Sequence, residues 1–242
     1  MTRAIVIGAN SSIAQCCIEQ LLNEGVVNHV TAISRSEDPE LLSQFESNLH
    51  WICCDYAEDS IKAVCADLKG DANDISHVVI CNGVLHSQQI DPEKRLEDIT
   101  AEKLQTIMQA NAIVPILWLA NLAPVLKGKL DCTVAIFSAR VGSIADNRSG
   151  GWYAYRASKA ALNMLVQTAG IEYQRRASNV KLIAFHPGTT ATQLSKPFQA
   201  NVPQGKLFTP AFVAKSLLEI MENSDRDSGA EFLDWAGKPI AW

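Results

Sequence analysis

Short runs of β-branched and apolar residues alternate with helix-favouring stretches from one end of this chain to the other. Strand, helix and strand in succession form the βαβ unit, and unbroken apolar strands are typical of a parallel sheet covered on both faces. We expect about seven strands, at residues 4–7, 29–33, 49–54, 77–81, 133–137, 180–185 and 230–233. Helices are expected at residues 13–23, 61–68, 101–126, 151–176 and 210–223. The predicted fold class is α/β, a doubly wound parallel sheet with helices on both faces.

Length and composition fit one domain of this kind. The chain has 242 residues, of which 48% are apolar, as in an ordinary globular core. Because no internal repeat or low-complexity linker divides it, we expect residues 1–242 to form a single domain. Residues 195–209 are the longest irregular stretch after the main strands. We expect them to form either a substrate lid or a solvated connection.

Charge and composition argue against several classes of protein. The net charge is −5, and Lys and Arg are scattered, which disfavours nucleic-acid binding. We identify no apolar run long enough to cross a bilayer and no signal-peptide pattern at the N-terminus, so we expect a cytoplasmic protein. The 7 cysteines and 5 histidines lack metal-ligand spacing. Reduced, buried thiols are expected in place of a metal site.

The first expected strand ends in a loop of small residues, Gly8-Ala9-Asn10-Ser11-Ser12-Ile13, which leads directly into a helix. Small residues at such a turn let the backbone approach a pyrophosphate, and the free N–H groups of the helix attract its charge. We therefore expect a dinucleotide in a Rossmann-type domain, although serine and alanine stand where further glycines are usual. A plain tight turn is the alternative. The expected contacts are Gly8, Asn10, Ser11, Ser12 and Ile13.

The end of the second strand indicates which dinucleotide is bound. The chain has Ser34 and Arg35 where an acidic residue would bind the ribose 2′-hydroxyl of NAD. Serine and guanidinium instead suit a 2′-phosphate. NADP(H) is therefore favoured over NAD(H). Glu37 or Asp38 would weaken that preference if either curled back to the ribose.

A tyrosine and a lysine, Tyr155 and Lys159, lie four residues apart in an expected helix. This spacing puts both side chains on one face of the helix. A nearby cation favours the phenolate, so we expect the pKa of Tyr155 to fall from ~10 toward neutrality and suit proton transfer to a substrate oxygen. Spacing alone also fits a surface coincidence, and the loop at Gly8 favours the functional interpretation.

Together, the loop at Gly8, the Tyr155 and Lys159 pair and the turn Pro187-Gly188 resemble the classical short-chain dehydrogenase/reductase family over nearly the whole chain. Residues 150–163 and 232–235 resemble its C-factor-like branch. The resemblance implies an NADPH-dependent oxidoreductase that transfers hydride between a nicotinamide and a small carbonyl or alcohol. It also implies a homodimer or homotetramer. An NADP(H)-binding signalling or interaction protein with little catalytic activity is the alternative.

The resemblance implies roles for individual residues. Tyr155 would be the general acid in carbonyl reduction, and Lys159 would lower its pKa and bind the nicotinamide ribose. Asn111 matches a helix asparagine that holds a water in the family's proton relay. The other implied cofactor contacts are Asp55 and Tyr56 beside the adenine, Asn82 and Gly83 after the fourth strand, and Pro187, Gly188, Thr190 and Thr192 near the nicotinamide.

The chain departs from the family pattern at two places. Cys81-Asn82-Gly83 stands where Asn-Ala-Gly is common. The catalytic serine normally precedes a glycine by three residues, and alignment on Gly142 puts Ala139 at its position. Ser138 is one residue early, and neighbouring strand residues face opposite ways. Ser143 lies close to the usual distance from the tyrosine. Ser138, Ser143 or neither therefore replaces the family serine.

Overall fold

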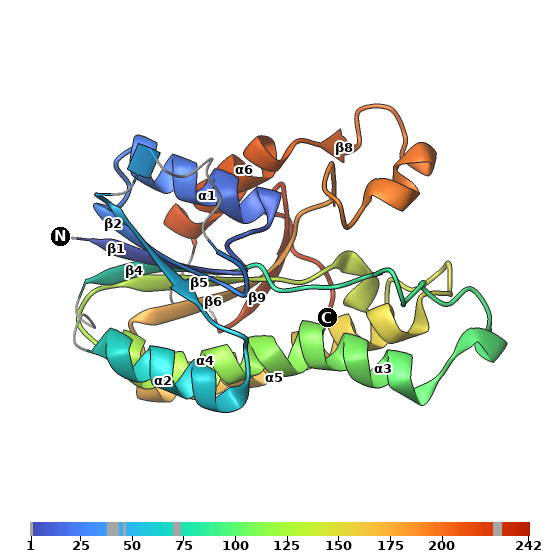
Figure 1. The fold of residues 1–242 in the computed structure, drawn as a ribbon, viewed down its shortest axis with the longest axis horizontal. Coiled ribbons are helices and arrows are strands. Elements are labelled where there is room, and N and C mark those ends of the chain that lie inside the picture. The colour runs from blue at the N-terminus through green and yellow to red at the C-terminus, as the bar shows by residue number, and fades with distance from the viewer. Residues whose placement is uncertain (1, 38–43, 46, 70–73, 225–228) are drawn as a thin grey trace.

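The computed structural model describes residues 2–37, 44–45, 47–69, 74–224 and 229–242. Its centre is a seven-stranded sheet in the order β3-β2-β1-β4-β5-β6-β9 (Figure 1), and every neighbouring pair is parallel. The strands are β1 (Arg3–Ile7), β2 (His29–Ser34), β3 (Leu49–Cys53), β4 (Ile75–Ile80), β5 (Cys132–Phe137), β6 (Val180–His186) and β9 (Glu231–Asp234). The strand order reverses between β1 and β4, which is where doubly wound folds bind their ligands.

Helices cover both faces of the sheet, as expected. Figure 1 shows α1 (Ser12–Asn23) and α6 (Pro210–Glu222) on one side. The other side carries α2 (Glu58–Leu68), α4 (Val114–Leu126) and α5 (Tyr153–Arg176). Because strand side chains alternate between faces, β1 serves two cores. Ile5 and Ile7 belong to the core under α2, α4 and α5, whereas Ala4 and Val6 belong to the core under α1 and α6.

The long helix expected at 101–126 is continuous but not uniform. It begins as α3 (Ala101–Met108), widens into a π-helical segment (Gln109–Ile113) and continues as α4. By length and composition, this run is the one helix in the described residues that could cross a membrane, with a mean hydropathy of 1.4, so our prediction that none reaches that length was wrong. Half of its apolar window is buried. Trp118, Leu119 and Leu122 have no exposed surface, because they pack in the core.

The stretch expected to be irregular, 195–209, contains local structure. A 3-10 helix, η6 (Lys196–Asn201), precedes β8 (Leu207–Phe208), which pairs in parallel with β7 (Thr189–Thr190). Gly188 makes the turn before β7 with a φ of 71°, and a Cβ there would lie 2.6 Å from the Phe208 ring. Only glycine fits such a close approach at positive φ. The segment around β8 lies beyond the carboxyl ends of the main strands, as Figure 1 shows.

Candidate active site

A cavity of about 610 Å³ opens at the carboxyl ends of the central strands. Its walls come from the residues that follow four strands of the sheet. They are residues 10–13 after β1, 81–83 after β4, 138–139 after β5 and 187–190 after β6. This is the position at which open α/β sheets bind ligands, since the strand order reverses there.

The loop after β1 has the form of a phosphate cradle. Gly8 has a φ of 76°, and a Cβ on it would lie 3.1 Å from the carbonyl carbon of Cys81. Ser11 caps α1, because its hydroxyl accepts a hydrogen bond from Ala14 N at 3.3 Å. The turn is therefore tight enough for close backbone approach and presents the N-terminus of a helix to the cavity.

Tyr56, expected beside the adenine, has its side chain under the loop after β1. Its ring is buried, and its hydroxyl accepts from Gly8 N at 3.1 Å and donates to Ile33 O at 3.2 Å. The Tyr56 hydroxyl thus holds the backbone of the loop after β1 in place. Asp55 is exposed, and the N–H of Ala57, donating at 2.9 Å, lowers the pKa of its carboxyl. After β3, the side chain exposed to solvent is therefore the carboxylate of Asp55, whereas the Tyr56 hydroxyl is turned toward the loop.

The residues after β2 lie beside the loop after β1. Asn10 Nδ2 donates to Ser36 Oγ at 3.0 Å, which joins the two loops. Ser34 is buried at the end of β2, whereas Arg35 is exposed. The guanidinium carbon of Arg35 lies 5.9 Å from the centroid of the Tyr56 ring. Arg35 thus lies at the outer edge of the loop region, against the Tyr56 ring and with no ion pair among the described residues.

Tyr155 and Lys159 lie on α5 and line the same cavity. Lys159 is buried, its Nζ donates to Phe137 O at 2.8 Å, and it lies 5.9 Å from the centroid of the Tyr155 ring. Burial raises the pKa of Tyr155 to about 12 and lowers that of Lys159 to about 7. The expected fall of the Tyr155 pKa was wrong for this arrangement, because loss of water outweighs attraction across such a distance.

Asn111 lies in the π-helical segment and has no exposed surface. Its Oδ1 accepts from Val84 N at 2.6 Å, and its Nδ2 donates to Val84 O at 2.8 Å and to Ser158 Oγ at 3.0 Å. The side-chain amide therefore joins the loop after β4 to α5. If this segment holds the water expected from the resemblance, a backbone group of the π-helical turn would bind it, because the side-chain amide of Asn111 already has partners.

The two candidate serines are placed differently. Ser138 lines the cavity, but its hydroxyl donates to Asn163 Oδ1 at 2.5 Å. Ser143 is buried with no hydrogen-bond partner among the described residues, and it is absent from the cavity wall. Ala139 lines the cavity. The wall at the expected serine position is therefore a methyl group, and the hydroxyl of the neighbouring Ser138 already binds Asn163.

The turn after β6 is held in place over the cavity. Pro187, Gly188, Thr190 and Thr192 all line it. Ser195 bridges the turn, because its hydroxyl donates to Thr190 O and accepts from Thr192 N at 3.3 Å. The structure therefore gathers these four residues at one wall of the cavity.

Leu85 and Val141 line the cavity and were not predicted from the sequence. Trp152 and Phe198 lie in the two stretches from which we expected a substrate pocket, 143–152 and 195–209, and both line the cavity, whereas residues 143–151 do not. His186, which we expected to be a packed residue at a strand end, also lines it. Burial lowers the pKa of His186 to about 4, with Arg140 acting in the same direction. No periodic pattern marks such residues, since loops and strand ends carry them. Within the described ranges, no group of three or more His, Cys, Asp or Glu side chains could hold a metal ion.

Glu93 was missed entirely. It is only 2% exposed, and its carboxylate accepts a hydrogen bond from Ala154 N at 3.2 Å, in the first turn of α5. Its backbone carbonyl accepts from Trp152 N at 2.5 Å. An acidic group is favourable at a helix N-terminus. Glu93 therefore fixes the start of the helix that carries Tyr155.

Comparison with known proteins identifies the family. The model of the short chain dehydrogenase family matches residues 2–203. The chain belongs to the short-chain dehydrogenase family. Benzil reductase ((S)-benzoin forming) of Bacillus cereus is 26% identical over 252 residues, covering 95% of this chain and 97% of the relative. C-signal of Myxococcus xanthus is 29% identical over 147 residues, covering 61% of this chain and 83% of the relative.

The short-chain dehydrogenase fold is confirmed by solved structures. The NADPH-bound carbonyl reductase from chicken fatty liver superposes with a TM-score of 0.82 at 23% identity, covering 100% of this chain and 99% of the other. C-signal among the relatives confirms the resemblance to the C-factor-like branch. The expected enzyme class is confirmed as well: the chain is an NAD(P)-dependent oxidoreductase of this family.

Proposed function

We propose that this oxidoreductase is an NADPH-dependent carbonyl reductase, or the reverse alcohol dehydrogenase, with Tyr155 as its acid/base group. The observation that carries the proposal is that Tyr155 and Lys159 line one cavity together with the loop at residues 10–13 and the turn at Thr192. The nicotinamide, when bound, supplies or accepts the hydride. The chain's own residues bind and orient the cofactor and the substrate, and they transfer the proton.

The residues of the cavity fit a dinucleotide. Gly8 packs against the backbone of Cys81 at a positive φ, which keeps the turn before α1 tight, and Asn82 Oδ1 is buried without a hydrogen-bond partner among the described residues. Ser34 and the exposed Arg35 support NADP(H) over NAD(H), since a guanidinium pairs well with a 2′-phosphate. Two acidic residues could oppose this preference. Glu37 is exposed after β2, and Asp38 lies outside the described residues.

The remaining contacts follow the resemblance and the cavity wall. Thr192 would hydrogen-bond the carboxamide, and Lys159 the nicotinamide ribose. The other residues proposed to hold the cofactor are Asn10, Ser11, Ser12, Ile13, Asp55, Gly83, Pro187, Gly188 and Thr190. Tyr56 is proposed to act indirectly, by supporting Gly8.

In the reduction direction, Tyr155 would donate its phenolic proton to the carbonyl oxygen. A pKa of about 12 keeps the phenol protonated at neutral pH, which suits a general acid. The charge left on the phenolate would be stabilised by the ammonium of Lys159, which lies on the same face of α5. Asn111 supports this pair by joining Ser158 of α5 to the loop after β4.

The methyl group of Ala139 is expected to limit the rate. A hydroxyl there would polarise the substrate carbonyl, and removing one such donor slows comparable reactions by about 10²-fold or more. Ser138 could substitute only by releasing Asn163. We therefore propose a working but slow reductase.

The alternative, a nucleotide-binding signalling protein with little activity, draws on Ala139 and on the similarity to C-signal. Tyr155, Lys159 and Asn111 argue against it, because a protein that only binds the nucleotide has no need of a proton donor beside the cavity. Tight binding of NADPH without turnover of any carbonyl compound would favour this alternative.

The test is to replace Tyr155 by phenylalanine. We expect Tyr155→Phe to bind NADPH with an unchanged Kd, because the ring and Lys159 remain, and to lose measurable carbonyl reduction. Binding would be followed by calorimetry and turnover by NADPH absorbance. Turnover equal to that of the wild type would refute Tyr155 as the proton donor.

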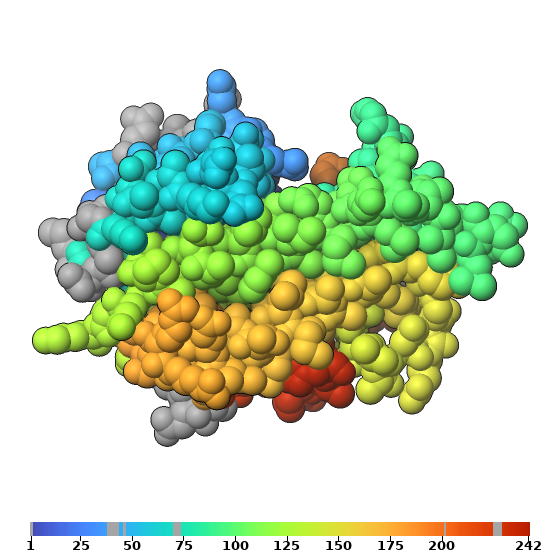
Figure 2. Space-filling view, turned by 90° about the horizontal axis from the view of Figure 1, so that it is seen from below, coloured from blue at the N-terminus to red at the C-terminus, as the bar shows by residue number. Residues whose placement is uncertain are grey.

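A homodimer or homotetramer is also proposed, with α4 and α5 packing between subunits. Figure 2 shows these helices side by side across one face of the molecule. A groove of about 330 Å³ runs between them, lined by apolar residues such as Ala123 and Leu165. Met164 and Ile171 on α5 are 67% and 47% exposed. Large exposed apolar side chains on a helix that borders an apolar groove are typical of an interaction surface.

A further inference from the structure

The part of the cavity beyond the dinucleotide loops carries a group of large apolar side chains. It receives side chains from the loop after β4, the loop after β5, the start of α5 and the segment around η6. We call these side chains the apolar wall: Leu85, Val141, Trp152, Leu194, Phe198 and Val202. A pocket of this kind binds its ligand mainly through excluded water and shape.

Aromatic rings connect the apolar wall to Tyr155. The Trp152 ring lies 6.2 Å from the Tyr155 ring at 79°, and 4.9 Å from the Phe198 ring at 59°. The His86 ring contacts Phe198 at 5.9 Å from the other side. A substrate carbonyl that receives its proton from Tyr155 must lie beside that residue. Because Trp152 contacts Tyr155, a group attached to this carbonyl lies within reach of the Trp152 ring.

Trp152 is held in place by an unusual backbone. Gly150, Gly151 and Trp152 have φ values of 62°, 65° and 54°, and a bulky residue at positive φ is strained. Such strain persists only where the surroundings enforce it, often at functional sites. The bond from Trp152 N to Glu93 O provides this restraint.

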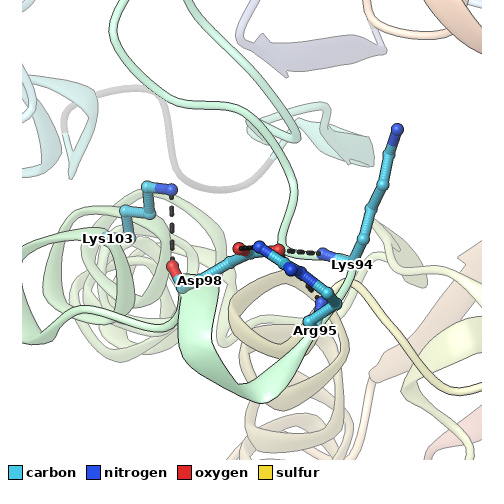
Figure 3. A network of polar contacts seen from close by, with 4 residues as sticks. All are labelled: Lys94, Arg95, Asp98 and Lys103. Atoms are coloured by element: carbon cyan, nitrogen blue, oxygen red, sulfur yellow. Dashed lines mark hydrogen bonds and ion pairs between the residues drawn. The ribbon is translucent and has the colours of Figure 1, made fainter.

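The loop that carries Glu93 is fixed in turn. Figure 3 shows Asp98 with its carboxylate toward the backbone of Lys94 and Arg95, and Lys103 near its carbonyl. The carboxylate accepts from Lys94 N at 3.2 Å and from Arg95 N at 3.0 Å. Trp152 is therefore held in the cavity wall by contacts within the protein itself.

Charge is scarce around the cavity. Among the described residues that line it, Lys159 alone carries a charged side chain, and it belongs to the catalytic pair. His186 is neutral at pH 7, because burial lowers its pKa to about 4. The nearby guanidinium of Arg140 is paired with Asp234 at 3.2 Å and Asp146 at 3.5 Å. Apart from Lys159, which belongs to the catalytic pair, an anionic substrate would thus find no cationic partner among the described residues that line the cavity, and losing its water would be costly.

We propose that the apolar wall selects uncharged carbonyl compounds that carry an aromatic ring next to the carbonyl, with that ring against Trp152 and Phe198. This inference rests on the proposed reductase activity and specifies its substrate class. Flat apolar rings gain both buried area and edge contacts with such side chains. Small aliphatic ketones gain neither, and carboxylates are excluded.

The experiment compares three dicarbonyl probes with the wild-type protein and NADPH. They are 1-phenyl-1,2-propanedione, 2,3-butanedione and phenylglyoxylate, which present a ring, no ring, and a ring with a negative charge. We expect kcat/KM for the phenyl diketone to exceed each of the others by about tenfold or more, the size of effect that one aromatic contact and its buried area produce. Equal or better turnover of either other probe overturns the inference.

Two variants assign the selectivity to the apolar wall. Trp152→Gly removes the ring yet accepts the positive φ, and Phe198→Leu keeps an apolar side chain without the aromatic face. Each is expected to lower the ratio of kcat/KM for the phenyl diketone to kcat/KM for 2,3-butanedione by about tenfold, through the KM of the phenyl diketone. Equal losses for both probes would contradict a role in ring recognition.

Binding separates failure of this inference from failure of the proposed function. The Kd of each probe is measured by calorimetry with the NADP-loaded Tyr155→Phe protein, in which no turnover is expected. Tighter binding of the phenyl diketone than of 2,3-butanedione supports the inference, whether or not the wild type reduces any probe. If the wild type reduces none of them, only the proposed reductase activity is refuted. Equal Kd values for the phenyl diketone and 2,3-butanedione overturn the inference, whatever the wild type reduces.

Discussion

At the scale of single residues, burial determines the protonation of the Tyr155 and Lys159 pair. The lysine ammonium has one backbone acceptor, Phe137 O, and the tyrosine ring lies 5.9 Å away. Taking water from both groups favours their neutral forms, so the pKa of Tyr155 rises and that of Lys159 falls. A phenol that stays protonated is suited to give a proton, and its neighbour is poised to change charge near neutral pH.

The depressed pKa of Lys159 makes stability depend on pH. Between its folded pKa of about 7 and its unfolded value near ~10.4, the unfolded chain binds more protons, so stability rises with pH. We expect the free energy of unfolding to increase by about 2 kcal/mol from about pH 7 to about pH 9 through this group. Urea denaturation of the wild type and of Lys159→Met would be compared, because the variant lacks the titration. The same pH slope in both proteins would contradict the assignment.

Ala139 gives the second prediction at this scale. Ala139→Ser places a hydroxyl on the cavity wall, so kcat for carbonyl reduction is expected to rise by about tenfold or more. Steady-state kinetics with NADPH measure the effect. Ser143→Ala is the matched control and should leave kcat unchanged, since Ser143 does not line the cavity. If Ser143→Ala abolishes activity instead, Ser143 and not position 139 supplies the hydroxyl.

At the scale of elements, the first turn of α5 is the critical region. The helix has no side-chain cap on its N-cap residue, Trp152, which is left-handed. Glu93, distant in sequence, supplies the acceptor for Ala154 N. Gly142 packs against the same helix, since a Cβ there would lie 2.7 Å from the carbonyl carbon of Lys159. The position of Tyr155 therefore depends on two loops outside its own helix.

Replacing Glu93 tests this dependence. Glu93→Ala removes the acceptor at the helix start and should lower the free energy of unfolding by about 1 kcal/mol, as for a lost N-cap. Chemical denaturation measures the loss. Glu93→Gln keeps an oxygen acceptor and should retain most of the stability, so an equal loss in both variants would indicate that the charge, not the hydrogen bond, matters.

At the scale of the whole molecule, the face formed by α4 and α5 predicts assembly. Met164→Glu places a charge at an exposed apolar site on this face, so we expect the wild type to sediment as a dimer or tetramer and the variant to shift toward monomer. Analytical ultracentrifugation measures the masses. Leu96→Glu is the control, because Leu96 is also 67% exposed but lies in η3 (Leu96–Asp98), off this face. Wild-type protein that stays monomeric at micromolar concentration would contradict the proposed interface.

The sequence by itself determined the sheet, its helices and the identity of the pair on α5. These depend on periodicity and on spacing within one element, which a local pattern records. Local reasoning also located the loop at Gly8 and the turn at Pro187, because each follows directly from the end of a strand. The missing hydroxyl at Ala139 could likewise be read from its distance to Gly142.

The tertiary structure decided what surrounds those residues. It gave Tyr56 a supporting role, engaged the Asn111 amide and brought Glu93 to the start of α5. It also reversed the expected direction of the Tyr155 pKa. The physical reason is that burial, desolvation and contacts between distant loops depend on how the whole chain packs, and no local pattern encodes them.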